Sequence, residues 1–514
     1  MLVKTFGYAV QGIHATRVTV EVSIGIGINF YLVGLPDNAV KESHQRIDTA
    51  LKQNGYKIPG KQITVNMAPA DIRKEGSAYD LCIAAGILAA SEQMNGEALG
   101  DYVIMGELAL DGAIRPIRGA LPIAVSAQRE GFKGILLPEP NAREAAVVSN
   151  LQVYPVNHIN QLIDFFNGTA ELPQLTINLA EAFSSHVGTG EFDFADVKGQ
   201  ENIKRALEIA AAGGHNVILI GPPGAGKTML SKRLPGILPP LTLEEALETT
   251  KIHSVAGKTA KQGIGLVTQR PFRSPHHTIS DIALVGGGNN PQPGEISLAH
   301  NGVLFLDELP EFKRTVLEVM RQPIEDRVVT ISRAKFSVEY PASFMLIASM
   351  NPCPCGFYNH PEKECVCAPG VVQKYLNKIS GPLLDRIDLH IEVTPVPFSE
   401  LSRQQSTEHS VEIRNRVIKA RDIQITRYAA EADIHCNAHM RSKDLKAYCR
   451  LNEAGAQLLK NAMERLGLSA RAYDRILKVA RTIADLDAST NIETNHVAEA
   501  IQYRSLDRDG WAGS

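Results

Sequence analysis

A glycine-rich loop between an apolar strand and a helix constrains the fold of this chain most. The run GPPGAGKT occupies residues 221–228, follows the apolar stretch NVILI and leads into the helical run TMLSKRL. Gly221, Gly224 and Gly226 allow the backbone to curl, so that consecutive N–H groups point at phosphates beside the positive end of the helix dipole. Strand, loop and helix in this order predict a phosphate-binding loop of an α/β domain.

The residues of the loop have separate expected roles. Lys227 is expected to reach the β- and γ-phosphates of ATP, and the Thr228 hydroxyl is expected to ligate Mg²⁺. The alternative is a turn that binds nothing, but a Lys-Thr pair after such a loop has no structural purpose. The predicted nucleotide-binding residues are Gly221, Pro222, Pro223, Gly224, Ala225, Gly226, Lys227 and Thr228.

Two acids follow a second apolar strand. The run GVLFLDEL covers residues 302–309 and ends a buried strand in Asp307 and Glu308. Asp307 is expected beside the Mg²⁺, and Glu308 where it can polarise an attacking water. The pair alone is equally compatible with a solvated turn, but together with the phosphate loop it predicts ATP hydrolysis.

Length and composition bound the class of protein. At 514 residues the chain is too long for one hydrophobic core. A hydrophobic share of 44% with 21% charged residues is typical of a soluble globular protein. The net charge of −3 gives no general attraction to polyanions, so a DNA partner would be held by local basic loops. Neither a signal peptide nor an apolar run of about 18 residues is found, which predicts a cytoplasmic protein without a membrane partner.

The periodicity of the chain predicts three parts joined by one linker. Strand-like and helical runs alternate over residues 1–170, and residues 171–192 form the linker. A second α/β unit covers residues 193–397, with strands suited to a parallel sheet. Long amphipathic stretches over 398–514 predict an all-α lid.

Three more polar residues occur in an order known from one class of motor. FMLIASMNP places Asn351 at the end of an apolar strand, GPLLDRID presents Arg386, and LSARAYDRILKVARTIADL presents Arg471 on a helix. With these motifs the whole chain resembles the magnesium-chelatase-like AAA+ ATPases of the ComM (YifB) family. The resemblance implies a Lon-protease/S5-like α/β N-terminal domain, an AAA+ P-loop α/β core and an all-α C-terminal lid.

The resemblance also implies roles for these three residues. Asn351 would be the polar sensor that positions the water, Arg386 a finger that reaches a neighbour's γ-phosphate, and Arg471 the sensor of the lid. An arginine that acts in trans requires a closed ring, so we expect a homo-oligomer, with a hexameric ring as the expected form. Ordinary ion pairs are the alternative for both arginines, and Arg475 and Arg481 compete with Arg471.

Two insertions are expected in the ATPase core. Residues 272–297 are Gly-rich at their end and contain His276 and His277. A metal site is the alternative for these histidines, but neighbours in an extended segment should point to opposite sides, which favours a structural role. VVTISRAKFSVEY predicts a hairpin with Arg333 and Lys335 near its tip. Related motors grip their substrate with a hairpin at this position, so both cations are candidate DNA contacts, with solvated turn charges as the alternative.

A cysteine cluster follows Asn351 by two residues. Its pattern is C-x-C, nine residues and C-x-C, formed by Cys353, Cys355, Cys365 and Cys367. Four soft ligands in a compact loop favour structural Zn²⁺, although His360 can replace one thiolate and free thiols are the alternative.

The N-terminal domain resembles that of Lon-type serine-lysine proteases. RKEGSAYD matches the nucleophile loop and DGAIRPIRGALPIA the lysine segment. Ala78 stands at the serine position, with Ser77 beside it, and Leu121 stands at the lysine position. Because a serine without a base is not an activated nucleophile, we expect a non-catalytic scaffold or binding module.

The expected function is that of an ATP-hydrolysing ring motor. By resemblance the motor moves along single-stranded or branched DNA and promotes branch migration in recombination or natural transformation. A magnesium-chelatase motor subunit and an ATP-dependent protein remodeller are the alternatives.

Overall fold

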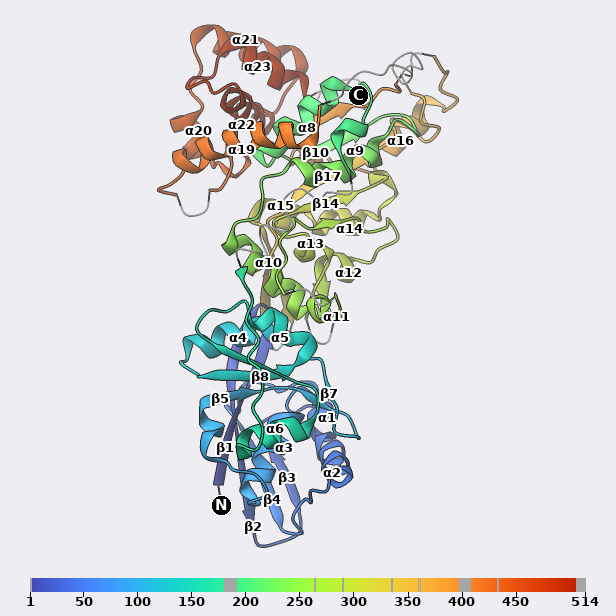
Figure 1. Cartoon of the computed structure of the whole chain (residues 1–514). Helices are drawn as coiled ribbons and strands as arrows, with labels where there is room; N and C mark the ends of the chain where they lie inside the picture. The colour runs from blue at the N-terminus through green and yellow to red at the C-terminus, as the bar shows by residue number, and fades with distance from the viewer. Residues whose placement is uncertain are drawn as a thin grey trace.

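The computed structural model describes most of the chain as three parts along one long axis (Figure 1). The described residues are 2–179, 192–262, 265–288, 291–333, 336–358, 360, 362–396, 408–431 and 434–504. Within these residues, no helix combines the length and apolarity needed to cross a bilayer. The predicted linker at 171–192 falls mainly on residues outside the described part.

The N-terminal part is built on a seven-stranded mixed sheet with strand order β3-β4-β2-β1-β5-β8-β9. The alternation of VTVEVSIG buries Val18, Val20 and Val22 on one face of β2, as its pattern predicts. Helix α3 is buried along its whole length, and its Asp80 is neutralised by Arg46 at 2.7 Å. The strands are β1 Leu2–Gln11, β2 His14–Gly25, β3 Phe30–Val33, β4 Gln62–Ala68, β5 Tyr102–Ile104, β6 Glu107–Leu108, β7 Ile114–Arg115, β8 Gly134–Pro138 and β9 Gln152–Val156. The helices are α1 Asn38–Lys41, α2 Ser43–Gln53, α3 Asp80–Ala90, α4 Ala120–Arg129, α5 Glu139–Ala145 and α6 Ile159–Asn167.

The central part contains a five-stranded parallel sheet with strand order β11-β14-β17-β10-β18. The inner strands are buried on both faces, which explains why their sequences are continuously apolar. The strands are β10 Val217–Ile220, β11 Phe272–Arg273, β14 Val303–Leu306, β17 Met345–Met350 and β18 Leu389–Glu392. Strand β10 lies between β17 and β18, so the order of strands in the sheet differs from their order in the sequence at this point. Such a topological switch point opens a crevice at the carboxyl ends of the strands.

Helices and two small strand pairs surround this sheet. The pairs are β12 Gly286–Gly287 with β13 Gln292–Pro293, and β15 Val328–Arg333 with β16 Phe336–Pro341. The second pair confirms the predicted hairpin. The helices are α8 Glu201–Gly213, α9 Lys227–Arg233, α10 Leu243–Val255, α11 Lys258–Gln262, α12 Asp281–Val285, α13 Glu295–Leu298, α14 Arg314–Val319, α15 Arg321–Asp326, α16 Pro369–Leu376 and α17 Gly381–Leu384.

The described C-terminal part is helical. It comprises α19 Ser410–Arg427, α20 Ser442–Tyr448, α21 Glu453–Leu466, α22 Ala470–Leu486 and α23 Thr494–Gln502. Apolar residues of α19 and α22, among them Val417 and Ile476, share one core with α8 of the central part. The predicted α/β multidomain class with an all-α C-terminal part is therefore confirmed.

The N-terminal and central parts meet through α4, α5, α10 and α11, which lie together in Figure 1. The Gly119 amide donates to the Ser254 carbonyl at 3.0 Å, and the Thr259 hydroxyl donates to the buried Glu144 at 2.7 Å. Val10 and Ile13, at the β1–β2 turn, also pack against the apolar cluster of the central part. Both polar and apolar contacts therefore hold this junction.

Candidate active site

The phosphate loop leaves β10 at the carboxyl edge of the parallel sheet. Gly221 lies so close to the Val393 carbonyl that a Cβ would stand 2.2 Å from its oxygen. Gly224 and Gly226 have φ values of +78° and +89°, a region in which side chains other than glycine are strained. The glycine spacing is thus required by the path of the backbone.

Lys227 and Asn351 meet in this loop although they are 124 residues apart. The Lys227 ammonium donates to the carbonyls of Gly221 and Pro222, at 2.7 and 2.9 Å, and to Asn351 Oδ1 at 3.0 Å. Burial lowers the pKa of Lys227, while Asp307 and Glu308 oppose that shift. The ammonium is held by neutral oxygens at the position from which a P-loop lysine reaches phosphate.

Asp307 lies beside Thr228 at the end of β14. The Thr228 hydroxyl donates to Asp307 Oδ2 at 2.8 Å, and the Ser349 hydroxyl donates to Oδ1. A hydroxyl and a carboxylate oxygen are hard ligands of the kind Mg²⁺ prefers, so this pair fits the expected metal. Ser349 was not predicted as a site residue, although its place two residues before Asn351 at the end of β17 is the signal that identifies it.

Glu308 follows in a left-handed backbone conformation with φ of +54°. Its side chain is 57% exposed, and its carboxylate lies 3.5 Å from Nδ1 of His277. The expectation that His276 and His277 point to opposite sides is wrong, because their ring centroids lie 4.1 Å apart, with the ring planes inclined by 33°. His277 belongs to the segment between β11 and α12, so it joins the first insertion to the site.

Arg386 and Arg471 are not brought to the phosphate loop of their own chain by any hydrogen bond or ion pair of the described residues. The Arg386 guanidinium is nearly buried and pairs with Glu325 of α15 at 2.7 Å. Arg471 is exposed and pairs with Asp385 at 3.3 Å. Its rival Arg475 binds the buried Asp388 at 3.0 Å, in the same loop as Arg386. The two lid arginines therefore hold the segment that carries Arg386.

The four cysteines form one cluster next to the phosphate loop. Their sulfur atoms all lie within 4.8 Å of one another, and three of the separations are 3.3, 3.5 and 3.7 Å. Tetrahedral zinc with Zn–S bonds of about 2.3 Å sets sulfur atoms about 3.8 Å apart, so the cluster fits the metal. A Cβ on Gly356 would stand 2.5 Å from Pro223 Cδ, which places the cysteine loop directly on residues 221–228. His360 is absent from the cluster of ligand atoms.

The remaining candidates lie away from this site. Arg333 is the last residue of β15, whereas Lys335 lies outside the described residues. In the N-terminal part, Ser77 donates to Glu107, Ala78 lines a cavity, and Leu121 is fully buried. No lysine is among the described residues that line this cavity.

Comparison with known families and proteins shows the family to which the chain belongs. Family models described as magnesium chelatase, subunit ChlI, its C-terminal part, and subunit ChlI of Mg-chelatase match residues 193–401, 407–504 and 18–141. The nucleotide loop, the parallel sheet and these matches define a magnesium-chelatase-like AAA+ ATPase.

Individual relatives narrow this class. Competence protein ComM of Haemophilus influenzae is 44% identical over 509 residues, which cover 99% of this chain and 98% of that protein. YifB of Salmonella typhimurium is 46% identical over 502 residues, 97% of this chain and 96% of that protein. Lon protease 2 of Bacillus subtilis is 32% identical over only 176 residues, 32% of this chain and 30% of that protein. The chain belongs to the ComM (YifB) family of magnesium-chelatase-like AAA+ ATPases, as its motifs predicted.

Proposed function

We propose that this protein is a ring-forming ATP-hydrolysing motor that moves along single-stranded or branched DNA. The observation that carries the ATPase part is the convergence of three segments: Lys227 binds Asn351, and Thr228 binds Asp307. Thr228 and Asp307 would hold Mg²⁺, which supplies charge neutralisation at the phosphates when bound. Family membership supports the same activity.

The site residues then divide the work of hydrolysis. Lys227 and the loop amides bind and orient the phosphates, and Glu308 polarises the attacking water while Asn351 orients it. His277, 3.5 Å from the exposed Glu308 carboxylate, would help to orient it towards the water. In this proposal one chain supplies only part of the active site, and a neighbouring subunit supplies the rest.

Arg386 is the candidate for the neighbour's contribution. It points to Glu325 of its own chain, and neither it nor Arg471 bonds the described residues of the phosphate loop. An arginine that acts on the next subunit requires head-to-tail contacts that close into a ring, and the family resemblance favours six subunits. Arg471 would be the residue of the lid that senses bound nucleotide, through its contact with Asp385.

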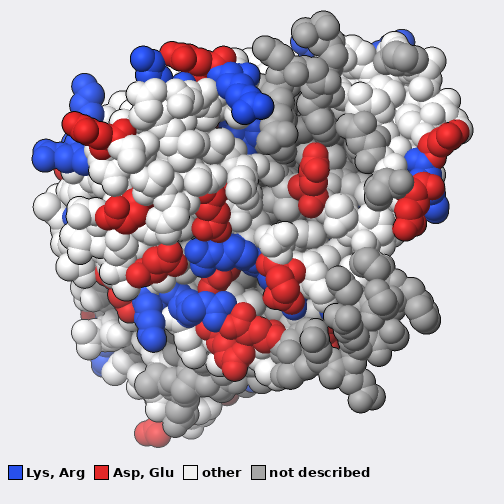
Figure 2. All heavy atoms as spheres, turned by 90° about the horizontal axis from the view of Figure 1, so that it is seen from above, with Lys and Arg blue, Asp and Glu red and all other residues white. Residues whose placement is uncertain are grey.

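The hairpin β15–β16 is the proposed DNA contact, with Arg333 and Lys335 as its cations. Lys and Arg side chains alternate with Asp and Glu side chains over the described part of the face seen in Figure 2. The described part of that face therefore offers no broad basic surface, so the proposal assigns DNA binding to a narrow local element. The name of the Haemophilus relative, competence protein ComM, favours DNA uptake or recombination as the task.

The cysteine cluster is proposed to hold Zn²⁺ through Cys353, Cys355, Cys365 and Cys367. Its spacing of sulfur atoms supports this assignment, and its contact with Pro223 supports a structural role next to the nucleotide. The chain's thiolates would fix the loop on which the P-loop rests.

A motor subunit of a magnesium chelatase is the second candidate, because all three family models carry the chelatase description. It differs in substrate, since it would act on a porphyrin-binding partner and not on DNA. ATP hydrolysis that is indifferent to DNA favours this candidate.

The test measures ATP hydrolysis and strand movement with single-stranded, duplex and branched DNA. We expect branched or single-stranded DNA to raise the hydrolysis rate and a labelled branched substrate to be resolved. Glu308→Gln should bind ATP but lose both activities by at least about 100-fold, because the water loses its polarising carboxylate. Wild-type protein that hydrolyses ATP but leaves every DNA substrate unchanged over a range of salt concentrations contradicts the DNA motor.

A further inference from the structure

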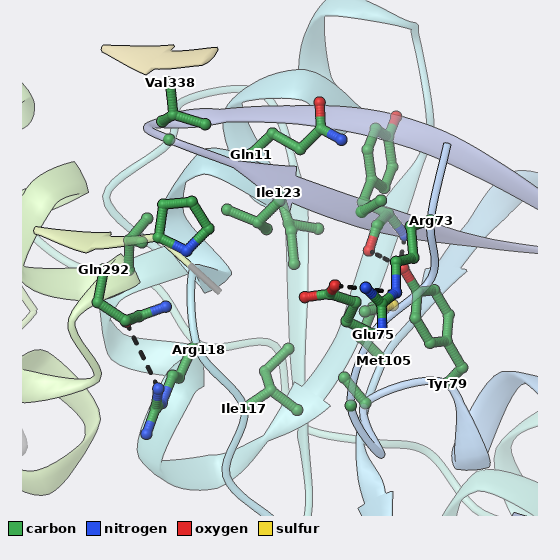
Figure 3. Close-up of a pocket in the computed structure, with 18 of the residues that line it drawn as sticks. Gln11, Arg73, Glu75, Tyr79, Met105, Ile117, Arg118, Ile123, Gln292 and Val338 are labelled. Carbon is green, nitrogen blue, oxygen red and sulfur yellow. Dashed lines mark hydrogen bonds and ion pairs between the residues drawn. The ribbon is translucent and has the colours of Figure 1, made fainter. Parts of the chain in front are cut away.

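A cavity lies where the N-terminal sheet meets the central part, away from the nucleotide site (Figure 3). Its volume is about 410 Å³, within the range of about 300 to 1,000 Å³ that ligand sites occupy. Met105, Ile117 and Ile123 line it from the N-terminal part, and Val338 and Tyr340 line it from the hairpin strand β16. The cavity therefore belongs to both parts of the molecule.

One wall of the cavity is a strand edge that lacks a partner strand. Strand β1 pairs with β5 only at Phe6, and β5 ends at Ile104. Beyond that point the Tyr8 amide donates to Met105 Sδ at 3.4 Å, and Tyr8 O accepts from the Tyr79 hydroxyl at 3.1 Å. The backbone groups of Tyr8 therefore point away from β2 and towards the cavity side.

The backbone N–H and C=O of Val10 point in the same direction as those of Tyr8. In an antiparallel pair, alternate residues turn their N–H and C=O to the same side, so Val10 shares the orientation of Tyr8. Val10 lines the cavity, and no side chain or backbone group of the described residues bonds its N–H or C=O on that side. A donor and an acceptor in strand geometry thus face the cavity.

The charges of the cavity favour a neutral chain over an anion. Its charged lining residues are two arginines and two glutamates, namely Arg73, Arg118, Glu75 and Glu107. Figure 3 shows the ion pair of Arg73 with Glu75 on one side and the contact of Arg118 with Gln292 on the other, at 3.2 and 3.4 Å. Because the cavity has as many carboxylates as guanidinium groups, it gives no net attraction to phosphate groups. The neutral amides of a peptide require no such attraction.

We propose that this cavity binds an extended polypeptide segment of a partner protein, which adds to the free edge of β1 at Val10. Main-chain hydrogen bonds to Val10 give affinity, and an apolar side chain of the segment enters the space between Ile123 and Val338. Binding extends the sheet by a short strand and requires no catalysis by Ser77. The cavity excludes the nucleotide site, although strand β16 of the hairpin proposed above as the DNA contact forms one of its walls.

The probe is a positional-scanning library of fluorescent, acetylated hexapeptides, titrated with the full-length protein and followed by fluorescence anisotropy. We expect saturable binding by members that carry a large apolar residue at one position. Methylation of the peptide nitrogen that pairs with Val10 should weaken binding at least about tenfold, because it removes one main-chain hydrogen bond and crowds the strand edge. Methylation at the next nitrogen, which points the other way, should change affinity little.

Two protein variants locate the binding. Ala78→Trp fills the cavity from its wall, and Ala170→Trp makes the same change at an exposed residue away from it. The first should abolish peptide binding and the second should leave it unchanged, with ATP hydrolysis of both variants reporting intact folding. Lack of saturable binding by any hexapeptide up to about 1 mM overturns the proposal. Binding that survives Ala78→Trp in a folded protein, or that is insensitive to every N-methylation, also overturns it.

Discussion

Glu144 is a buried acid at the junction between the N-terminal and central parts. Its carboxylate accepts from Asn141 at 2.8 Å and from Thr259 of the central part at 2.7 Å. Burial raises its pKa, and these hydrogen bonds only partly oppose the shift. One residue thus makes the stability of the junction depend on pH.

The sign of this dependence follows from the raised pKa. The folded protein holds the proton of Glu144 more tightly than the unfolded chain, so the stabilisation is complete below the unfolded pKa and is lost as pH rises through the folded pKa. Glu144→Gln removes the buried charge and can still bond both neighbours. We expect this variant to melt about 2 to 4 °C above the wild type at neutral pH, with a difference that disappears towards pH of about 4.

Thermal melts of the two proteins across this pH range measure the difference in melting temperature. Glu139→Gln, on the same helix but exposed, is the matched control and should follow the wild type. A Glu144→Gln protein that is less stable than the wild type at neutral pH would show that the carboxylate's hydrogen bonds outweigh its desolvation.

At the scale of elements, the cysteine loop is the clearest case of a local structure that supports the nucleotide site. It begins two residues after Asn351 and packs on Pro223 through Gly356, whose φ is +84°. Without a metal, four thiols in contact contribute little to hold such a loop, whereas structural zinc contributes folding free energy directly. The conformation of residues 221–228 should therefore depend on the metal.

Cys365→Ser should reduce bound zinc from equimolar to near zero and lower the ATP hydrolysis rate about tenfold, through displacement of the loop that Pro223 contacts. Elemental analysis of purified protein measures the metal, and a coupled assay measures hydrolysis. Cys436→Ser is the control, because Cys436 is buried outside the cluster. The Cys436→Ser protein should therefore keep the zinc. Equal zinc content in the two variants rules out the cysteine cluster as the metal site.

Prediction from sequence worked for elements whose pattern is long and failed for contacts between distant elements. The strands β10, β14 and β17 are buried on both faces, so their apolar runs identify the parallel sheet and its polar ends. Strand β11 has only two residues and shows no periodicity, and for this reason the place of His277 beside Glu308 was not predicted. The pair of Arg386 with Glu325 joins segments about 60 residues apart, and nothing in either local sequence marks it.

At the scale of the whole molecule, the placement of Arg386 and Arg475 bears on the proposal that a neighbouring subunit completes the site. Arg386 is held by Glu325 and the Pro382 carbonyl, and Arg475 binds Asp388 two residues further on. The loop of Arg386 is thus tied to the lid, and the Arg386 guanidinium is nearly buried against Glu325. In the proposed ring a neighbouring subunit would bring its phosphate loop against this loop, and Arg386 would leave Glu325 to complete the site.

Mixed assemblies test this arrangement directly. Lys227→Ala removes the phosphate-binding lysine, and Arg386→Ala removes the proposed finger, so each variant alone should lose hydrolysis. In an equal mixture half of the phosphate loops and half of the fingers are intact, and random assembly restores about a quarter of the interfaces. The mixture should therefore recover about a quarter of the wild-type rate, provided that the subunits exchange.

The matched control mixes wild-type protein with the double variant Lys227→Ala/Arg386→Ala. The same arithmetic gives about a quarter of the interfaces with both groups intact when the groups act in trans, but about half of the sites when both act within one chain. Mass photometry shows whether mixed assemblies form. Mixed rings in which the two single variants remain inactive, while the control retains about half the wild-type rate, would place Arg386 in the site of its own chain and remove the need for a ring.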